Sequence, residues 1–528
     1  MPRSRRSTLN SMIPRLLLPL SLLVVLAMIG GPAVASNPNG FLTDQDAMLE
    51  GVAEGVTVVP IVTVGETIDG YRFEAIPDGI SIGSGTKKYV TVYVNHETST
   101  VPFPYVLPPT IDNSLNDFDN AQLSGLRLSL ANAGVLKGVL AIRSNQNYQR
   151  FCSNFLAGPD QGFDQPLLFT NEEATDLVNR HGDAWPAGPN AEQAGVVVAF
   201  DPATGRQRPI YGLGRANHEN TVPIPGYDQA VLLTDDDTFA APSAEMYMYL
   251  AADRDAVWND QGSLYAFVSD DPLVNDYGDL TLGADVSGSF IAVPEDVARG
   301  DQTGLESWSV ANNVFQFIRT EDIAYDRNDP HIVYIADTGE PRAIADPLTG
   351  RLKRGPSGTQ GPWPNGRLFR MVLNDSNPLT VDSLSIVIDA DAGGYNNPDA
   401  LHNLDNLETT ENSILIQEDP GSHNQFTPED PLGVAARVWR YDLTTGELTV
   451  AAMVDQSGDP IAKLGAWESS GIVDVSDLFG AGTFLVNVQA HTIFVETAPG
   501  PDLIEPEGPD WLYKREGGQL LLITIPGA

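Results

Sequence analysis

The stretch that decides the fold reads VWRYDLTTGELTV and occupies residues 438–450. Two short runs rich in β-branched and aromatic residues flank an Asp-x-x-Thr-Gly segment, which is typical of a turn between antiparallel strands. The same order recurs at residues 196–211, which read VVVAFDPATGRQRPIY. Both stretches therefore predict a strand, a turn and a second strand.

Similar strands recur along the chain without a strict period. Residues 264–268 (LYAFV) and 368–372 (LFRMV) resemble the first strands of two further units, and 49 Gly and 39 Pro residues supply turns. Repeated strand–turn–strand units predict an all-β fold, namely a β-propeller with six blades as the expected number. Long polar insertions at residues 101–121, 155–190 and 340–365 interrupt the units.

Helical periodicity is scarce in this chain. Residues 119–133 are the best candidate for a helix, because leucines recur there at positions 123, 126, 128 and 130. No linker or shift in composition divides the chain after its first 35 residues. We therefore expect a single propeller domain over residues 36–528.

Residues 1–35 have the features of an export signal. They carry four arginines and an apolar stretch at residues 16–29, and Ala33-Val34-Ala35 is a small-residue cleavage site. Ser4-Arg5-Arg6 resembles a twin-arginine signal, whereas the apolar stretch also suits the general secretory route. No later stretch approaches the roughly 20 apolar residues of a membrane span. We expect an exported protein without a membrane span, in the periplasm, at the cell surface or outside the cell.

Charge and cysteine content exclude some classes of partner and cross-link. The formal charge of −40 becomes −44 once the four arginines of residues 1–35 are removed, because that segment contains no Asp or Glu. Binding nucleic acid requires clustered Lys and Arg, so nucleic acid is not expected as a partner. Cys152 is the only cysteine, which excludes an intramolecular disulfide. We expect a monomer.

Several short apolar runs end in carboxylates. They lead into Glu97, Glu173, residues 235–237, Asp337 and residues 418–419, and Glu468 belongs to the same class. We interpret each run as a buried strand that brings acids to one rim of a sheet. Acids gathered at one rim repel each other, and Ca2+ relieves that repulsion. The pattern predicts a metal-rich site, with solvated acidic turns as the alternative.

Two motifs add imidazole and thiol groups to these acids. Asn-His-Glu occurs twice, at residues 95–97 and 217–219, and uses two of seven histidines. Adjacent carboxylate and imidazole groups suit a metal shell, so Glu97 is a candidate ligand; capping of a turn is the alternative. As a thiolate, Cys152 is a ligand for a soft or borderline metal, and otherwise it is a small buried apolar residue.

In this order, the acidic motifs resemble those of the PhoX-type alkaline phosphatase family. The resemblance covers nearly the whole chain after the export signal, and its order is more specific than any one motif. It implies a six-bladed propeller, twin-arginine export and hydrolysis of phosphate monoesters at a site that holds iron and calcium. The matching stretches are residues 95–97, Cys152 with 171–173, 218–219 with 235–237, 321–324, 334–337, 405–407, 418–419 and 468–489.

The resemblance also implies roles for individual residues. By position, Cys152, Glu219 and Glu321 are similar to the iron ligands, and Arg319 or Arg150 is expected to neutralise the phosphate. The residues similar to nearby or calcium ligands are Glu173, Asp322, Asp405 and Glu418. The chain departs from the family at residues 153–169, which replace a Gly-Gly-x-Thr-Pro-Trp-Gly-Thr-like run, and at residues 489–491, which read QAH.

Three functions remain open from the sequence. The first is an exported phosphoesterase that uses calcium and iron and acts on a small phosphorylated substrate. The second is a propeller that calcium stabilises and that binds a partner without catalysis. The third is a calcium-dependent lactonase or esterase, because one fold supports many chemistries.

Overall fold

The computed structural model describes residues 39–102, 116–238, 244–394, 397–421, 433–499 and 512–528. They belong to the compact unit Pro38–Ala528, and Met1–Asn37 forms the other unit of the chain. The predicted export signal at residues 1–35 lies outside the described residues. None of the helices within the described ranges is long and apolar enough to cross a membrane.

Two four-stranded antiparallel sheets follow each other in the chain. Each is a meander, with strands that pair in chain order. The first contains β5 (Pro77–Gly85), β6 (Tyr89–His96), β8 (Gln122–Ser129) and β9 (Val135–Ile142). The second contains β10 (Phe151–Ala157), β11 (Leu167–Glu172), β14 (Val197–Asp201) and β15 (Arg206–Ile210).

The next sheet has nine strands, because the outer strands β20 and β26 pair with each other and join two meanders. One meander runs outward through β16 (His218–Pro223), β17 (Ala230–Asp236), β18 (Met246–Ala251), β19 (Ser263–Ser269) and β20 (Asp285–Ala292). The other runs outward through β21 (Thr320–Tyr325), β22 (Ile332–Asp337), β25 (Arg367–Asn374) and β26 (Asn377–Asp389).

The last two large sheets each take a strand from near the beginning of the described chain. One contains β27 (Leu404–Thr409), β28 (Ser413–Glu418), β29 (Arg437–Asp442), β30 (Leu448–Val454) and β1 (Leu49–Gly51). The other contains β31 (Glu468–Asp474), β32 (Thr483–Pro499), β33 (Leu512–Thr524) and β2 (Thr57–Thr63), and β7 (Asn116–Asp117) also pairs with β33.

Short elements decorate these sheets. Three two-stranded ribbons are β3 (Thr67–Ile68) with β4 (Tyr71–Arg72), β12 (Leu177–Val178) with β13 (Glu192–Gln193), and β23 (Ala343–Ala345) with β24 (Leu352–Arg354). The helices are α1 (Arg254–Trp258), α2 (Glu295–Ala298), α3 (Gln302–Ala311) and α4 (Ser476–Phe479). The 3-10 turns are η1 (Ser144–Gln146), η2 (Pro159–Gln161), η3 (Gly188–Asn190), η4 (Tyr211–Leu213), η5 (Ala390–Gly393) and η6 (Gln456–Gly458).

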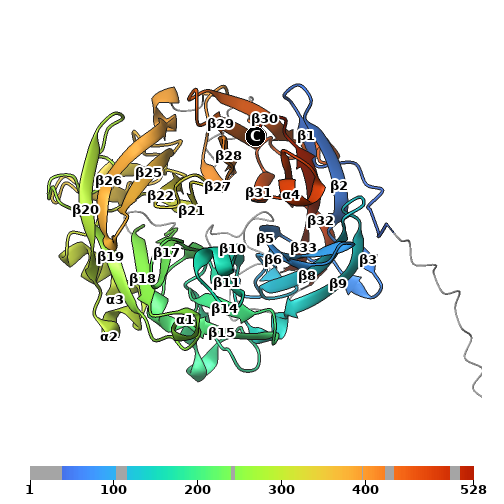
Figure 1. Ribbon diagram of the computed structural model, residues 1–528, viewed down its shortest axis with the longest axis horizontal. Coiled ribbons are helices and arrows are strands. Elements are labelled where there is room, and N and C mark those ends of the chain that lie inside the picture. The colour runs from blue at the N-terminus through green and yellow to red at the C-terminus, as the bar shows by residue number, and fades with distance from the viewer. Residues whose placement is uncertain (1–38, 103–115, 239–243, 395–396, 422–432, 500–511) are drawn as a thin grey trace, which may run out of the picture. The chain divides into compact units, whose positions relative to one another are not determined.

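The first strands of the meanders form a closed cycle of contacts. Strand β5 contacts β10, and the contacts continue through β16, β21, β27 and β31 back to β5. Figure 1 labels five of these strands, β5, β10, β21, β27 and β31, on the side of each sheet that faces the centre of the view. The nearly all-β, propeller-like architecture predicted from the sequence is therefore confirmed.

The hairpins that decided the fold have the predicted turns. Asp201 Oδ1 accepts hydrogen bonds from the backbone N–H groups of Ala203 and Thr204, and Gly205 adopts φ +69°. The turn at Asp442 repeats this geometry, with Gly446 at φ +72°. Glycine suits both positions because other residues rarely adopt positive φ.

The helix expected at residues 119–133 is wrong. These residues contain β8, whose register pairs it with β6 on one side and β9 on the other. Leu123, Leu126 and Leu128 lie on both faces of the strand. All three are fully buried, because other parts of the domain pack against both faces of the sheet. Leucines that fill two faces of a buried strand do not follow the alternation of a half-exposed one.

Apolar side chains between adjacent sheets form the core. Phe267, Phe315, Phe317 and Phe369 belong to one buried cluster whose rings pack edge to face or tilted. Burial of a side chain of this size contributes about 1.5–3 kcal/mol. This packing holds the sheets in the positions that bring their first strands together.

Candidate metal centre

The first strands of the meanders carry their ligand-type residues at equivalent positions. The second residue of β5 is Asp78, and the second residue of β10 is Cys152. Strands β16, β21 and β27 have Glu219, Glu321 and Asp405 at their second position, and β31 begins with Glu468. In the first five of these strands the register is irregular around the second residue, and in β31 it becomes irregular only after Ser470. A bulge re-aims side chains, so this irregularity turns the second residue toward the centre.

The neighbouring second strands add acids one residue past their ends. Glu97 follows β6, Glu173 follows β11, Asp237 follows β17 and Asp419 follows β28. The residues immediately before them pair with the first residue of the inner strand, as in Phe151 with Glu172. The centre therefore receives groups from two strands of the same sheet.

Eight carboxylates and one thiol form four overlapping groups of potential metal ligands. Within each group the ligand atoms all lie within 4.8 Å of one another. Cys152, Glu219 and Asp405 each belong to two groups, so the groups form one continuous series. The groups are Asp78–Glu97–Cys152, Cys152–Glu173–Glu219, Glu219–Glu321–Asp405 and Asp405–Asp419–Glu468.

Burial and mutual repulsion favour the protonated, uncharged forms of these carboxyl and thiol groups. Burial raises the pKa of Glu219 well above its ordinary value, and Glu173 and Glu321 raise it further. Burial and Asp78 raise the pKa of Glu97 to about 8. The same causes hold the pKa of the Cys152 thiol well above its usual range. A bound cation reverses this balance, because it stabilises carboxylate and thiolate.

Glu219 meets the requirement for a metal ligand most directly. Its side chain is fully buried, and Oε1 accepts a hydrogen bond of 3.1 Å from the Ser153 hydroxyl. Its Oε2 atom has no hydrogen-bond partner among the described residues. A buried carboxylate oxygen without a partner is costly, and a cation satisfies it. The residues present therefore fit a metal centre.

Cys152 lies beside a carboxylate that the sequence analysis missed. Its thiol donates a hydrogen bond of 2.8 Å to Asp78 Oδ2, and Ser470 donates to the other oxygen of Asp78. Asp78 follows a loop rather than an apolar run, because it comes at the start of β5. Its recurring place as the second residue of an inner strand is the signal that identifies it.

Arg319 lies at the edge of the centre and is almost fully buried. Its Nε donates to Asp237 at 2.7 Å, its terminal nitrogen donates to the same carboxylate, and Glu321 lies 3.0 Å from that nitrogen. Both carboxylates raise the pKa of the guanidinium, although burial opposes them. Arg150, the other candidate, makes an ion pair of 2.5 Å with Asp176.

Most of the predicted ligands lie together, and two do not. Asp322 accepts hydrogen bonds from Asn220 Nδ2 and from the backbone N–H groups of Ile323 and Leu407, which uses both of its oxygens. Glu418 is fully buried in a two-point contact with Arg437. Asp322 comes directly after Glu321, and Glu418 comes directly before Asp419; both of these neighbours belong to the ligand groups. The predicted residues inside the groups are Glu97, Cys152, Glu173, Glu219, Glu321 and Asp405.

A cationic network adjoins the end of the series. His491 Nδ1 lies 2.6 Å from Glu516 Oε2, and its Nε2 lies 3.5 Å from Glu468 Oε1. Burial alone would lower the pKa of His491, but the two glutamates raise it well above its usual range. Lys514 also pairs with Glu516. These groups hold Glu468 in place beside Asp405 and Asp419.

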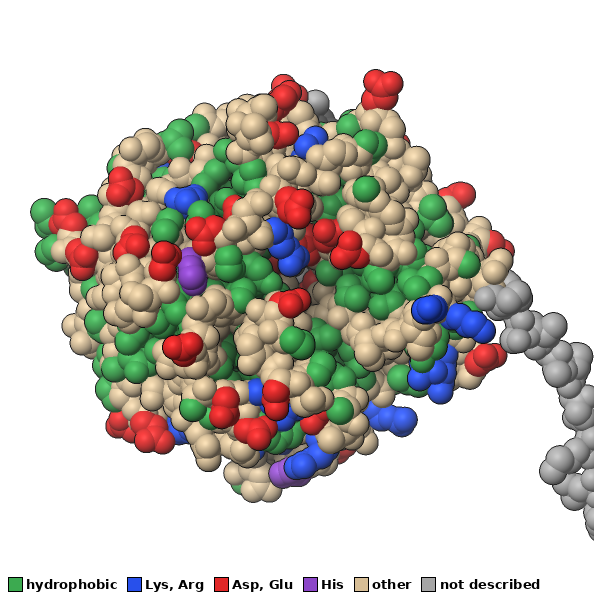
Figure 2. Space-filling view, in the orientation of Figure 1, with side chains coloured by type: hydrophobic (Ala, Val, Ile, Leu, Met, Phe, Trp, Pro, Cys, Tyr) green, Lys and Arg blue, Asp and Glu red, His purple; other side chains and the backbone are tan. Residues whose placement is uncertain are grey.

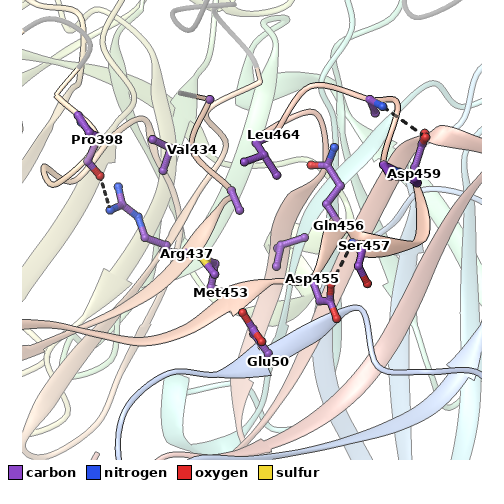
Figure 3. A pocket seen from close by; sticks show the side chains of 15 residues that line it. Glu50, Pro398, Val434, Arg437, Met453, Asp455, Gln456, Ser457, Asp459 and Leu464 are labelled. Atoms are coloured by element: carbon purple, nitrogen blue, oxygen red, sulfur yellow. Dashed lines mark hydrogen bonds between the residues drawn. The ribbon is translucent and has the colours of Figure 1, made fainter. Parts of the chain in front are cut away.

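A separate pocket of about 570 Å³ lies beside β30 and η6, and none of the ligand groups lines it. Arg437 points into this region and donates a hydrogen bond of 3.0 Å to the backbone oxygen of Pro398 (Figure 3). Acidic side chains are scattered over the face seen in Figure 2, in keeping with the net charge of −40. Neither this pocket nor this acidic surface brings together as many buried ligand-type side chains as the candidate metal centre does.

Comparisons with known proteins find similarity in structure and none in sequence families. No family model matches the chain, and no curated protein sequence matches it. A structure of Pseudomonas fluorescens PhoX in complex with vanadate, a transition state analogue, is 16% identical; the match covers 92% of this chain and 98% of that one, with a TM-score of 0.56.

Two other structures have TM-scores too low to support an argument. The tricorn protease is 9% identical over 79% of this chain and 33% of that one, with a TM-score of 0.31. The parainfluenza virus 5 hemagglutinin-neuraminidase ectodomain is 8% identical over 89% and 84%, with a TM-score of 0.34. The likeness to PhoX, at its low identity, means that this chain and PhoX share a fold.

Proposed function

We propose that this protein is a metal-dependent phosphoesterase that hydrolyses phosphate monoesters at the candidate metal centre. The observation that carries the proposal is the equivalent placement of Asp78, Cys152, Glu219, Glu321 and Asp405 as second residues of inner strands. The fold shared with PhoX, a protein captured with a transition state analogue, supports it.

We also infer that the domain is a six-bladed propeller over residues 36–528. The closed cycle of six inner strands supports this count, since each strand begins one meander. In this interpretation the nine-stranded sheet is two blades joined at their outer edges by β20 and β26.

The chemistry of the ligand groups suggests two kinds of metal. Cys152 with Glu173 and Glu219 combines a thiolate with carboxylates, which suits iron. Asp405, Asp419 and Glu468 offer oxygen atoms alone, which suits calcium. Glu321 belongs to the group between them. We propose iron at the first group and calcium at the last.

The residues of the centre have distinct parts in this proposal. Bound metals would polarise the phosphate oxygens and supply or orient the nucleophile. Ser153 holds Glu219 through its hydrogen bond, and Arg319 holds Glu321 and Asp237. Because two carboxylates engage Arg319, we assign it a positioning role. The substrate is a small phosphorylated molecule, which the exported protein meets outside the cytoplasm.

Activity and metal content test this proposal together. The chain freed of residues 1–35 and loaded with calcium and iron should release phosphate from p-nitrophenyl phosphate, and vanadate should inhibit it. Chelation should abolish the activity, and restored metals should recover it. Full occupancy by both metals without phosphate release would contradict the proposal. Calcium without iron would instead favour a non-catalytic propeller or a lactonase, which hydrolysis of a lactone panel would distinguish.

A further inference from the structure

The pocket beside β30 and η6 is walled mainly by three parts of the chain. They are β1, the segment that runs from the end of β30 through η6 to residue 464, and residues 433–437 at the start of β29. Glu50 on β1 lies opposite Met453 on β30, and opposite residues of an antiparallel pair share a face of the sheet. The volume of about 570 Å³ is in the range of about 300–1,000 Å³ that small-molecule sites have.

Local hydrogen bonds hold the loop that walls this pocket. Asp455 accepts a hydrogen bond of 2.9 Å from the backbone N–H of Ser457, and Asp459 Oδ1 accepts from two backbone N–H groups further along at 3.3 Å. On the other side, a Cβ atom at Gly433 would lie only 3.0 Å from Leu464 Cβ, so a glycine there lets the two sides approach closely. The walls therefore have a defined shape before any ligand binds.

Gln456 provides the observation that points to a ligand. This residue lines the pocket and is 5% exposed, and its Nε2 donates a hydrogen bond of 2.6 Å to the backbone oxygen of Lys463. That bond fixes the orientation of the amide, and Oε1 then has no hydrogen-bond partner among the described residues. Figure 3 shows this oxygen on the side of the amide toward Leu464. A buried carbonyl oxygen without a donor is costly, so a ligand that donates a hydrogen bond would be stabilised here.

The charges around the pocket select for a positive ligand. Glu50, Asp455 and Asp459 line it, and Arg437 is the one cation among its lining residues, all of which lie within the described ranges. The guanidinium of Arg437 already contacts both oxygens of Glu418 and donates to two backbone oxygens. The three lining carboxylates therefore leave the pocket with an excess of negative charge.

We propose that this pocket binds a small organic cation, with a primary ammonium group on a compact apolar body. The ammonium donates a hydrogen bond to Gln456 Oε1, and the three carboxylates attract its charge. The apolar body packs against Val434, Met453 and Leu464, which also line the pocket. None of the lining residues belongs to the ligand groups of the metal centre, so the site is independent of the proposed phosphoesterase activity.

Calorimetric titration with phenethylammonium tests the site. The purified protein is first loaded with calcium and iron, so that the metal centre is not open to the probe, and one phenethylammonium ion should then bind per chain. Phenethyl alcohol has the same shape without the charge and should bind at least about tenfold more weakly, because a charged donor makes the stronger hydrogen bond. Phenylacetate, which reverses the charge, should not bind. Equal affinity for the ammonium and the alcohol, or no binding of the ammonium, would overturn the proposal.

A pair of tryptophan variants locates the bound probe. Leu464 is 49% exposed and lines the pocket, so Leu464→Trp should fill the space without disturbing the core and weaken binding at least about tenfold. Ile461 is 95% exposed and does not line the pocket, so Ile461→Trp is the matched control and should bind as the wild type does. Both variants should keep the melting temperature of the wild type. Equal binding by the two variants would show that the overall negative charge, and not this pocket, attracts the probe.

A second pair of variants tests the charge of the pocket. Glu50→Gln removes one lining carboxylate and should weaken binding of phenethylammonium several-fold, because it lowers the attraction for the ammonium. Glu54→Gln makes the same change of charge at an exposed residue outside the pocket and should leave the affinity unchanged. Equal affinities of these two variants would contradict the role assigned to Glu50 and to the charge of the pocket.

Discussion

Glu418 and Asp419 are neighbours in the sequence but have different surroundings. Glu418 is paired with the buried Arg437 at the end of β28, and Asp419 lies one residue further along, in a ligand group with Asp405. Glu321 and Asp322 divide in the same way, because Asp322 binds backbone N–H groups and Asn220. At this scale one step along the strand decides whether an acid supports the fold or faces the centre.

The pair Glu418 and Asp419 gives a direct test of this division. Glu418→Gln should lower the free energy of unfolding by about 3–5 kcal/mol, because it leaves the Arg437 charge buried without its partner. Asp419→Asn should change that free energy, measured in chelator, by less than about 1 kcal/mol. Only Asp419→Asn should reduce the calcium content. Denaturant unfolding and elemental analysis measure both effects, and a calcium loss confined to Glu418→Gln would reverse the assignment.

Cys152 separates iron from calcium at the centre. Cys152→Ser keeps the size of the side chain and removes the thiolate, so iron content should fall while calcium at Asp405, Asp419 and Glu468 remains. Phosphate release should fall at least about a hundredfold, since metal ligands and their supports often matter by that factor. Elemental analysis with the p-nitrophenyl phosphate assay measures this. Unchanged iron in the variant would remove Cys152 from the ligand set.

Single elements repeat one design around the domain. Five of the six inner strands begin with a residue that pairs normally, present a ligand-type residue at their second position and depart from regular pairing there. The irregularity is what lets adjacent residues such as Glu219 and Asn220 have different roles. The turns at Asp201 and Asp442 belong to outer strands and have no part in the centre.

The outer turns should therefore affect stability alone. Gly205 adopts φ +69° with open space around it, so Gly205→Ala introduces backbone strain without a clash and should cost about 1–2 kcal/mol. Gly158 also has open space but no positive φ, and Gly158→Ala is the control, expected within about 0.5 kcal/mol. Urea unfolding measures both. Equal effects would contradict the role assigned to the left-handed conformation.

The sequence predicted the all-β elements and the acid-rich site better than it predicted individual ligands. The strand-end pattern singled out Glu97 and Glu173, and the structure brings both into the ligand groups, because an acid after an apolar run is visible in one dimension. The resemblance also named Asp322 and Glu418, which lie one residue outside the ligand groups, because the direction of each side chain depends on the local register, which no sequence pattern reveals. Asp78 was missed since it begins a strand, and residues 119–133 were misread since both faces of β8 are buried.

At the scale of the whole molecule, removal of the metals leaves the carboxylates of the candidate metal centre close together, where they repel one another. Carboxyl groups whose folded pKa is raised bind more protons in the folded state than in the unfolded one. Their contribution to stability is therefore lost as pH rises from the unfolded value toward the folded one. For Glu97 this window runs from 4.5 to about 8.

Metal-free protein should accordingly unfold more easily as pH rises through this window. The melting temperature in chelator should fall between about pH 5 and 8, whereas saturating calcium and iron should raise it and flatten the dependence. Thermal scans at several pH values, with and without metals, make the comparison. A melting temperature in chelator that rises over this range would show that the carboxyls of the centre do not control stability.

The pairing of β2 with β33 has a consequence for how the protein forms. Residues 57–63 complete a sheet whose other strands come from residues 468–524, near the opposite end of the chain. Contacts between such distant residues form slowly, because a long loop must close first. During synthesis on the ribosome, β2 has no partner until almost the whole polypeptide has emerged. We therefore expect the pairing of β2 with β33 to be a late step of folding, which a chain truncated before residue 512 cannot complete.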